Sequence, residues 1–482
     1  MEETSQRSLT EGSVPKKMLL FALPIFFSNL FQQLYNAADS LIVGTFIGGE
    51  ALAAVSSSGS LILLLIGFIN GVSLGAGVLI ARLYGANDRE DLERAIHTTV
   101  ALGLVAGAVL TVAGVLLTPQ ILRLMGTPSD VIDDSVAYFR VYFLGSSAVV
   151  LYNMGASILQ SVGDSRSPMK YLILSSLINV VLDLFFVAGL GYGVASAALA
   201  TVISQVVSAF LAFRKLSRTA APYRVCWRRV RFDLPMLRQV VTLGIPSGVQ
   251  SSVVSLANVI VQSNINSFGS AAMAGCGAYS KIEGFAFLPV TCFSLALSTF
   301  VSQNIGAGRP ERVRAGMRFG LLCSPVLAEC IGVAIFTLSP LLISAFNSDP
   351  EVIAYGVADA RTVSLFYCLL SFSHCCAGIL RGFGKPVVPM AIMLSVWCAL
   401  RITYITVILR LIPDIHMLYW AYPLTWSISS VIFAFCILRL YRRQVDATSL
   451  RQGGADPGGP YPTGPRASYI LYPIPMPHPI SS

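Results

Sequence analysis

The chain has 482 residues, of which 55% are hydrophobic and only 12% are charged, and its mean hydropathy is +0.71. Because soluble domains carry roughly 25% charged residues, this composition excludes an ordinary soluble protein and indicates a protein embedded in a lipid bilayer. The net charge of +9 leaves open an acidic partner such as nucleic acid until the positions of the basic residues are considered.

The first apolar run extends from Met18 to Gly44 and follows a polar segment, residues 1–16, of mixed charge. The run is too long for the core of a cleavable signal, so we expect it to remain as a membrane-spanning helix. Asp39 lies within it. A carboxylate at that depth is costly unless it faces protein or water, which makes Asp39 a candidate functional residue.

Glycines, prolines and charge clusters divide the chain into twelve apolar segments. We therefore predict an all-α membrane protein with twelve transmembrane helices. The predicted spans are 17–43, 50–81, 94–118, 130–162, 168–190, 193–213, 237–267, 271–304, 314–345, 351–380, 386–411 and 418–440.

Most of the 33 lysines and arginines fall at one side of this arrangement: at both termini and in the loops after the even-numbered spans. The opposite ends carry only Arg123, Arg140, Arg361 and Arg410. The positive-inside rule then places both termini and the long 214–236 loop in the cytoplasm, in a multi-pass protein of the cytoplasmic (inner) membrane. The net charge is explained by topology, and we expect no nucleic-acid partner.

A second acid, Asp183, lies in the fifth span, with Asn179 four residues before it. Residues four apart project from one face of a helix. Burial in a low-dielectric site disfavours an ionised carboxylate, and two acids in one pocket reinforce that effect. Polar groups paired at membrane depth therefore indicate a proton or ion site.

Other local features point away from metal centres and ATP hydrolysis. The ten cysteines all lie at or after Cys226, without CxxC or histidine spacing typical of zinc sites, so no metal cofactor is expected. No GxxxxGK[ST] motif occurs, which excludes a self-contained ATP-driven pump. Residues 444–482 are rich in proline and glycine and are predicted to form a disordered tail.

The chain contains an internal repeat. At one constant offset, Ala81–Glu90 matches Ser302–Glu311 and Ile158–Gly163 matches Ile379–Gly384, while Pro24 pairs with Pro246 one position beyond that offset. We infer two six-helix lobes, residues 17–213 and 237–443, joined by the 214–236 linker, with a central cavity between them. Six is an even number, so both lobes enter the membrane from the same side, as in transporters that work by alternating access.

The acids are not repeated. Shifting Asp39 by the same offset reaches Ile260 or Val261, and shifting Asn179 and Asp183 reaches the neighbourhoods of Arg401 and Tyr404. The acids therefore indicate an added function of the first lobe rather than a requirement of the fold.

Together these features resemble the multidrug and toxic compound extrusion (MATE) transporters, over about residues 15 to 443. The resemblance rests on the two-lobe plan and on several short motifs. These are Leu23-Pro24, the position of Asp39, Gly85-Ala86, Gln303-Asn304-Ile305-Gly306-Ala307-Gly308 and Gly163-Asp164-Ser165-Arg166.

The resemblance implies a secondary antiporter that exports organic, often cationic, compounds in exchange for H+ or Na+. Within the family, the sequence resembles the DinF-type branch. The cation site of that branch maps here to Asp39, Asn179, Asp183 and Thr201, with Tyr35 and Asn153 as neighbours. If the ion is Na+, the resemblance implies that the same four residues bind it. The NorM-type branch uses a glutamate in span 7 and an aspartate in span 10. This sequence has Gln250 in span 7, and we find no acid deep in either span.

For the substrate cavity we expect contributions from Gln32, Gln250, Glu283 and Phe287. The roles of Lys281, Glu283, Glu329, His374 and Arg401 stay open.

Two other classes of protein remain as alternatives. A lipid-linked precursor flippase of the same superfamily would need a strongly cationic cavity, whereas only Lys281 and Arg401 lie well inside spans. A membrane enzyme would need convergent catalytic groups, which we do not find. We expect a monomeric transporter of small organic compounds in the lipid bilayer; the sequence does not choose between H+ and Na+.

Overall fold

The computed structural model describes residues 9–47, 49–124 and 132–453, and every regular element within these ranges is a helix. The chain divides into two compact units, Met1–Ile437 and Leu438–Ser482. The first unit contains both halves of the repeat and all the sites described below.

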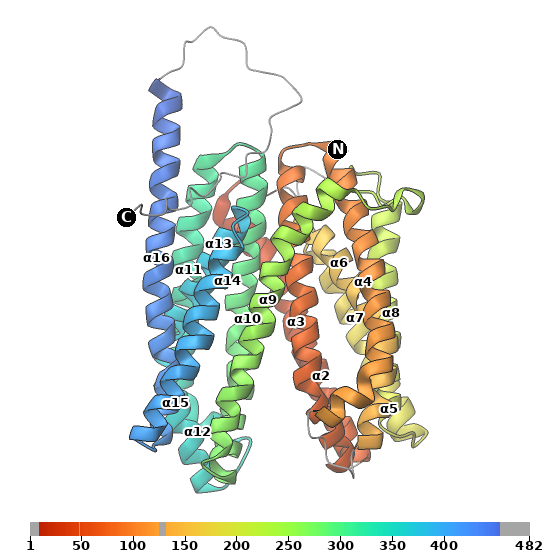
Figure 1. The fold of residues 1–482 in the computed structure, drawn as a ribbon, viewed down its shortest axis with the longest axis vertical. Helices are drawn as coiled ribbons and strands as arrows, with labels where there is room; N and C mark the ends of the chain where they lie inside the picture. Colours follow the sequence, from red (N-terminus) through yellow and green to blue (C-terminus); the bar gives the residue numbers. More distant parts are fainter. Residues whose placement is uncertain (1–8, 48, 125–131, 454–482) are drawn as a thin grey trace, which may run out of the picture. The chain divides into compact units, whose positions relative to one another are not determined.

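The first half of the repeat forms one helical lobe (Figure 1). A π-helical segment, η1, directly follows α7. The elements are α2 (Val14–Phe46), α3 (Gly49–Gly85), α4 (Arg89–Leu124), α5 (Ile132–Leu144), α6 (Ser146–Ser161), α7 (Arg166–Asp183), η1 (Leu184–Gly189) and α8 (Ala195–Arg218).

The second half forms a matching lobe, again with a π-helical segment, η4, in its fifth span. Its last helix runs from the first compact unit into the second. The elements are η2 (Trp227–Arg229), α9 (Leu234–Asn266), α10 (Ser270–Gly306), α11 (Pro310–Ser344), α12 (Pro350–Val363), η3 (Ser364–Phe366), α13 (Tyr367–Gly382), α14 (Val387–Met393), η4 (Leu394–Leu400), α15 (Arg401–Leu411) and α16 (Ile415–Gly453).

Eleven helices among the described residues are long and apolar enough to cross a membrane. The count reaches twelve when α5 and α6, which meet at an angle of 45° beside Gly145, are taken as one broken span. The predicted twelve-helix, two-lobe fold is therefore confirmed.

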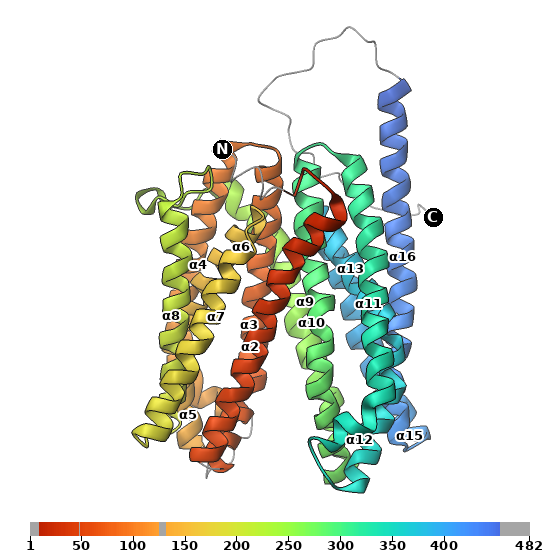
Figure 2. The ribbon, with the colours of Figure 1, turned by 180° about the vertical axis from the view of Figure 1, so that it is seen from behind.

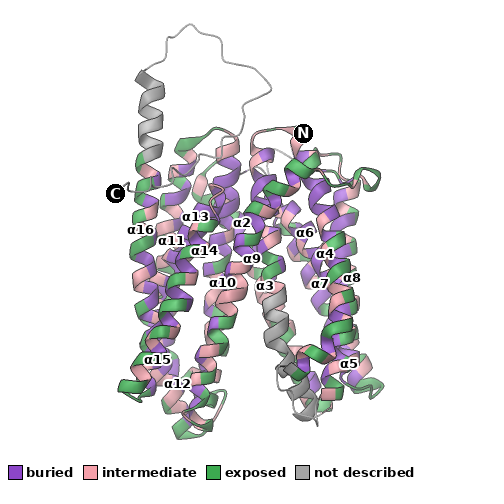
Figure 3. Ribbon diagram, viewed as in Figure 1, coloured by how far each residue is buried: buried purple, intermediate pink, exposed green. Residues whose placement is uncertain are grey.

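The helices carry large apolar side chains on their outer surfaces, as expected for contact with lipid. Val109, Leu116, Val181 and Leu322 expose 59%, 65%, 63% and 69% of their surface. Buried residues lie mainly where helices face one another (Figure 3). A soluble bundle would not expose so many large apolar side chains, and the exposed surface agrees with a lipid solvent.

Glycines bring the two lobes together at the end of the first unit where the described chain begins. Gly71 and Gly75 of α3 lie directly against Gly248 and Gly244 of α9, and a methyl group at any of these positions would collide with the other helix. Small residues let helix backbones approach closely within a membrane. Towards the opposite end, the ribbons of the two lobes diverge (Figures 1 and 2).

The linker between the lobes is fixed to the first lobe. The Cys226 amide donates to His97 Nε2 at 3.0 Å, and the Asp233 amide donates to Thr98 Oγ1 at 3.1 Å. Arg229 also forms an ion pair with Glu93 at 2.6 Å. The linker therefore packs as part of the first lobe.

The predicted tail begins later than residue 444, because α16 continues as a helix to Gly453. An apolar-to-polar transition near Arg442 marked the end of the membrane span, but it did not mark the end of the helix. Residues 454–482 lie outside the described part of the chain.

Candidate functional site

The first lobe brings its two intramembrane acids into contact. Asp39 lies on α2, Asp183 is the last residue of α7, and their carboxyl groups are within hydrogen-bonding range of each other. Asp183 has no exposed surface, and Asp39 is partly buried. The structure thus joins two residues that lie on different helices and far apart in the sequence.

The predicted amide and hydroxyl neighbours lie on the adjoining helices. Asn179 is completely buried one turn before Asp183, and its Nδ2 donates to Thr201 Oγ1 on α8 at 3.4 Å. The Thr201 hydroxyl itself donates to the carbonyl oxygen of Ala197 at 3.2 Å. The lone pairs of Asn179 Oδ1 and Thr201 Oγ1 consequently remain near the acids as neutral oxygen ligands.

Several buried oxygens in this cluster find no hydrogen-bond donor among the described residues. They are Asp39 Oδ1, Asn179 Oδ1, Asp183 Oδ1 and Asp183 Oδ2. Buried acceptors are normally paired, so four orphaned oxygens at one place require an explanation. A proton shared between the carboxyl groups, or a small cation held by the oxygens, would supply what the protein itself does not.

Tyrosines surround the acid pair. Tyr35 on α2 lies near Gln32 and Gln205 and within electrostatic reach of both acids. Tyr138 on α5 is also near both. Tyr35 was expected from the sequence, whereas Tyr138 was not, because only the packing of α5 against α2 and α8 brings it there.

The other predicted neighbour, Asn153, uses its amide within its own helix. Its Nδ2 donates to the carbonyl oxygen of Val149 on α6 at 2.8 Å. No hydrogen bond between Asn153 and either acid occurs among the described residues. The structure therefore places Asn153 in the same lobe without joining it to the pair.

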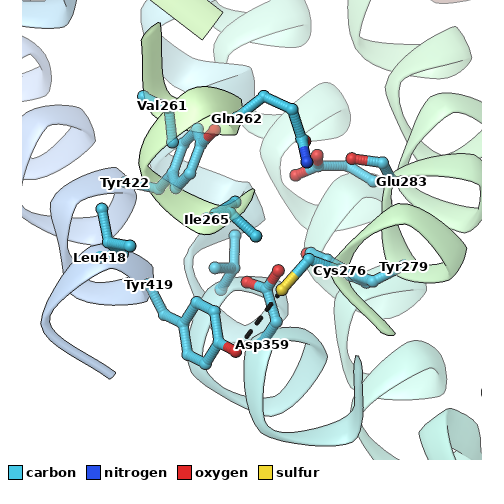
Figure 4. A pocket seen from close by; sticks show the side chains of 12 residues that line it. Val261, Gln262, Ile265, Cys276, Tyr279, Glu283, Asp359, Leu418, Tyr419 and Tyr422 are labelled. Carbon is cyan, nitrogen blue, oxygen red and sulfur yellow. Dashed lines mark hydrogen bonds between the residues drawn. The ribbon is translucent and has the colours of Figure 1, made fainter. Parts of the chain in front are cut away.

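The second lobe contains two acids of its own, one buried, Asp359, and one partly buried, Glu283. Glu283 on α10 and Asp359 on α12 line a small cavity of about 30 Å³ (Figure 4). A cavity of this size holds one or two water molecules, not an organic compound. Its lining is Val261, Gln262, Ile265, Cys276, Tyr279, Ser280, Glu283, Asp359, Val363, Leu418, Tyr419 and Tyr422.

Asp359 corrects the sequence analysis, which found no acid deep in span 10. The residue is 6% exposed, interacts with the Cys276 thiol and lies within electrostatic reach of Glu283. It was overlooked because it lies near the start of the span, where an acid usually reaches the membrane surface. Here α10 and α16 cover it, and that coverage arises only from tertiary packing.

A buried arginine accompanies the second acid cluster. Arg401, the first residue of α15, is 2% exposed and lies within electrostatic range of Glu283. Its guanidinium donates to Thr425 Oγ1 at 2.9 Å and to Asn258 Oδ1 at 3.5 Å, and it lies 4.4 Å from the Tyr422 ring centroid. The second lobe thus supplies its own positive charge.

Two residues expected in the substrate cavity make contacts within the second lobe. Gln250 is 7% exposed and donates to Met393 Sδ at 2.9 Å. The ring of Phe287 lies 6.4 Å from the rings of both Tyr367 and His374. These contacts place both side chains against α13 and α14.

The structure also locates the remaining polar residues. The imidazole of His374 lies 5.4 Å from the Trp397 ring in a tilted arrangement, and Glu329 Oε2 accepts from the Cys368 amide at 2.9 Å. Both lie inside the second lobe. Lys281 is exposed, whereas Arg381, absent from the expectations, is 9% exposed and donates to Ser294 Oγ.

Comparison with known sequences gives matches over most of the chain. The family model described as MatE matches residues 24–185 and 246–406. The probable multidrug resistance protein YoeA of Bacillus subtilis (strain 168) is 31% identical over 409 residues, covering 82% of this chain and 88% of the relative. A FAD transporter of Shewanella oneidensis is 24% identical over 397 residues, covering 81% and 87%.

Solved structures share the fold. One reported as the outward-facing conformation of a multidrug resistance MATE family transporter of the MOP superfamily superimposes with a TM-score of 0.84 at 21% identity. A MOP superfamily transporter from Pyrococcus furiosus, described as having a binding pocket of reversed polarity, gives the same values. Each alignment covers 90% of this chain and 97% of the other.

Proposed function

The chain belongs to the MatE family of multidrug and toxic compound extrusion transporters, and on that premise we propose that it is a proton-coupled antiporter. It would export organic, often cationic, compounds while protons enter, with Asp39 and Asp183 as the coupling site. The observation that carries this proposal is the pair of buried carboxyl groups in contact, with four oxygens that have no donor among the described residues.

The pair has two states with different mechanical consequences. When both acids are ionised, like charges face each other in a low-dielectric interior and repel. When one is protonated, its O–H donates to the other carboxylate in a charge-assisted hydrogen bond. The number of bound protons therefore sets whether α2 and α7 are pushed apart or drawn together.

The helix that carries Asp39 also touches the other lobe. Asn29 Nδ2 of α2 donates to Cys292 Sγ of α10 at 3.5 Å, and Gln33 packs against Gly284. Pro24 removes one backbone hydrogen bond within α2 and provides a point at which the helix bends. A shift of α2 at the acid pair would thus reach the contact between the lobes and bias alternating access.

A proton is the ion we favour, because the two carboxyl groups already contact each other directly. Na+ is a second candidate, since it would take several oxygen ligands, for which Asn179 Oδ1 and Thr201 Oγ1 are available. Sodium would have to separate the carboxyl groups enough to enter between them, whereas a proton requires no such rearrangement.

The remaining assignments follow the same proposal. The chain would act as a monomer in the cytoplasmic membrane, with both termini in the cytoplasm. The flippase alternative needs a strongly cationic cavity between the lobes. Of the two basic residues well inside spans, Arg401 is engaged within the second lobe and only Lys281 is exposed, which is too little charge for such a cavity.

Transport into proteoliposomes would test the proposal. Purified protein is reconstituted, and uptake of a panel of cationic dyes is followed while a pH gradient or a Na+ gradient is imposed separately. We expect dye movement to follow the pH gradient, to stop when a protonophore collapses it, and to ignore the Na+ gradient. Dye movement driven only by the Na+ gradient would show that Na+, not H+, is the coupling ion. Dye movement unaffected by the loss of both gradients would rule out antiport.

A further inference from the structure

The end of the first unit where the lobes meet contains two hydrogen bonds related by the internal repeat. Arg82 of α3 donates from Nη2 to the carbonyl oxygen of Gly382 at 3.2 Å. Gln303 of α10 donates from Nε2 to the carbonyl oxygen of Ser161 at 2.6 Å. Arg82 and Gln303 are equivalent positions of the repeat, and so are Ser161 and Gly382, so each lobe reaches into the equivalent turn of the other.

Glycines permit this close approach on both sides. A Cβ atom at Gly85 would collide with the carbonyl oxygen of Gln303, and one at Gly306 would collide with the carbonyl oxygen of Arg82. These glycines are also equivalent positions of the repeat. The backbones next to both donor residues are thus in direct contact.

The receiving turns share a backbone conformation. Gly163 and Gly384 have φ values of +89° and +75°, in the left-handed region that favours glycine. At Gly384 a side chain would also meet the Arg82 guanidinium, at 2.8 Å from Nη2. The turn is therefore shaped to admit the arginine.

The start of the described chain lies over the same place. The Leu9 amide donates to Gln303 Oε1 at 3.0 Å, while Asn304 and Arg312 donate to the Leu9 carbonyl oxygen at 3.4 and 3.1 Å. Leu9 is 2% exposed. The Gln303 side chain therefore bonds to both the Leu9 segment and the Ser161 turn of the first lobe.

We propose that Arg82 and Gln303, with the turns 161–164 and 382–385, form a reciprocal clasp that locks this end of the transporter shut and must open as a unit. As a step of alternating access, the clasp rests on the proposed transport function. Both bonds cross the same interface, so the lobes cannot part at one of them and stay joined at the other. The turn hydrogen bonds, such as Asp164 N to Leu159 O and Lys385 N to Leu380 O, are shielded only while the clasp is closed.

Hydrogen–deuterium exchange by mass spectrometry, on the full chain in lipid nanodiscs without substrate or gradient, would test the clasp. Gln303→Ala removes the bond to the turn at 161–164. We expect exchange to rise about 2- to 10-fold, as the loss of one hydrogen bond implies, at this turn and also at the distant turn 382–385. Arg82→Ala should produce the same paired increase, whereas Arg89→Ala, at an exposed arginine on the next helix, should change neither turn.

Glycine variants provide a second test. Gly85→Ala and Gly306→Ala place a methyl group between the two backbones and should raise exchange at both turns. Gly277→Ala on α10, where a Cβ atom meets nothing within 4 Å, is the control and should not change exchange at either turn. If these glycine variants do not purify as single species, the result for Arg82→Ala and Gln303→Ala decides whether the clasp exists. Those two substitutions only remove atoms and so cause no collision.

An increase confined to the turn that lost its own bond would show two separate contacts and overturn the clasp, as would no increase at either turn. Because the measurement uses no gradient and no substrate, a failure of antiport in proteoliposomes would leave this result unaffected.

Discussion

The acid pairs of the two lobes differ in how their charge is balanced. In the first lobe, Asp39 and Asp183 contact each other without a basic residue bonded to them in the described part of the chain. In the second lobe, Glu283 lies within electrostatic range of Arg401, whose guanidinium donates to side chains of α9 and α16, while Asp359 interacts with the Cys276 thiol. An acid pair without a nearby basic residue must take its balancing cation from solution. The difference therefore distinguishes a candidate coupling site from a cluster in which the protein itself supplies a positive charge.

The largest expected effect is on coupling at the first pair. Asp39→Asn or Asp183→Asn should each reduce proton-driven dye transport by about 100-fold or more. The amide that replaces one carboxyl group cannot take up or release a proton, and it leaves the other acid without an ionisable partner. The double variant should be little worse than either single one, since the acids act as a unit. Transport in proteoliposomes provides the measurement.

Asp134→Asn serves as the matched control for these variants, because Asp134 is an exposed acid of the same lobe. It should retain full activity. Undiminished proton-driven transport in either pair variant would contradict the role of the pair.

The second effect concerns the stability of the other lobe. Arg401→Gln removes the positive charge near Glu283 and the donors to Thr425 and Asn258, which should reduce the free energy of unfolding by about 1–3 kcal/mol. Thermal unfolding of the purified protein, followed by intrinsic fluorescence, would detect the loss. Adding Glu283→Gln should recover part of it, and Arg410→Gln, at an exposed position of α15, should change little. An unaltered unfolding temperature for Arg401→Gln would show that the arginine does not balance this cluster.

A smaller effect separates the two candidate ions. Thr201→Val removes a neutral oxygen ligand but no titratable group, so proton-driven transport should fall by no more than about threefold. Thr201→Ser keeps the hydroxyl and should resemble the original protein. A loss as large as that of Asp39→Asn in the valine variant would instead favour sodium.

The smallest effect is expected at the second acid pair. Asp359→Asn should leave the ratio of protons to exported compound unchanged and transport within about threefold, because the proposed coupling acids, Asp39 and Asp183, remain. Combined pH and dye measurements in proteoliposomes would test this. Abolished coupling in Asp359→Asn would shift the coupling site to the second lobe or divide it between both.

Much of the fold could be predicted because membrane spans depend on local sequence. Long apolar runs and basic loops located twelve spans to within a few residues over most of the chain, and the constant offset between repeated motifs separated the lobes. The continuation of α16 beyond Arg442 was not foreseen, because a helix can continue after the apolar residues end.

The sites were predictable only in part. Asn179 and Asp183 share a helix face, so their proximity followed from spacing, and Asp39 stood out as an acid within the first apolar run. The family resemblance added Thr201 and joined Asp39 to the other two. Asp359 was missed because its partners lie on α10 and α16, and no spacing within one helix reveals such a contact. The π-helical segment directly after Asp183 also had no visible sequence signal.

The opening segment of each half is anchored to the other half, and this affects how the chain assembles during synthesis. The amides of Cys226 and Asp233, just before α9, are held by the first lobe. The carbonyl oxygen of Leu9, just before α2, is held by Arg312, which comes far later in the chain, on α11. The ribosome therefore releases the beginning of the protein long before its anchor exists. The segment before the first helix can therefore form these contacts only after α10 and α11 have been made, since Gln303 and Asn304 of α10 also bond to Leu9.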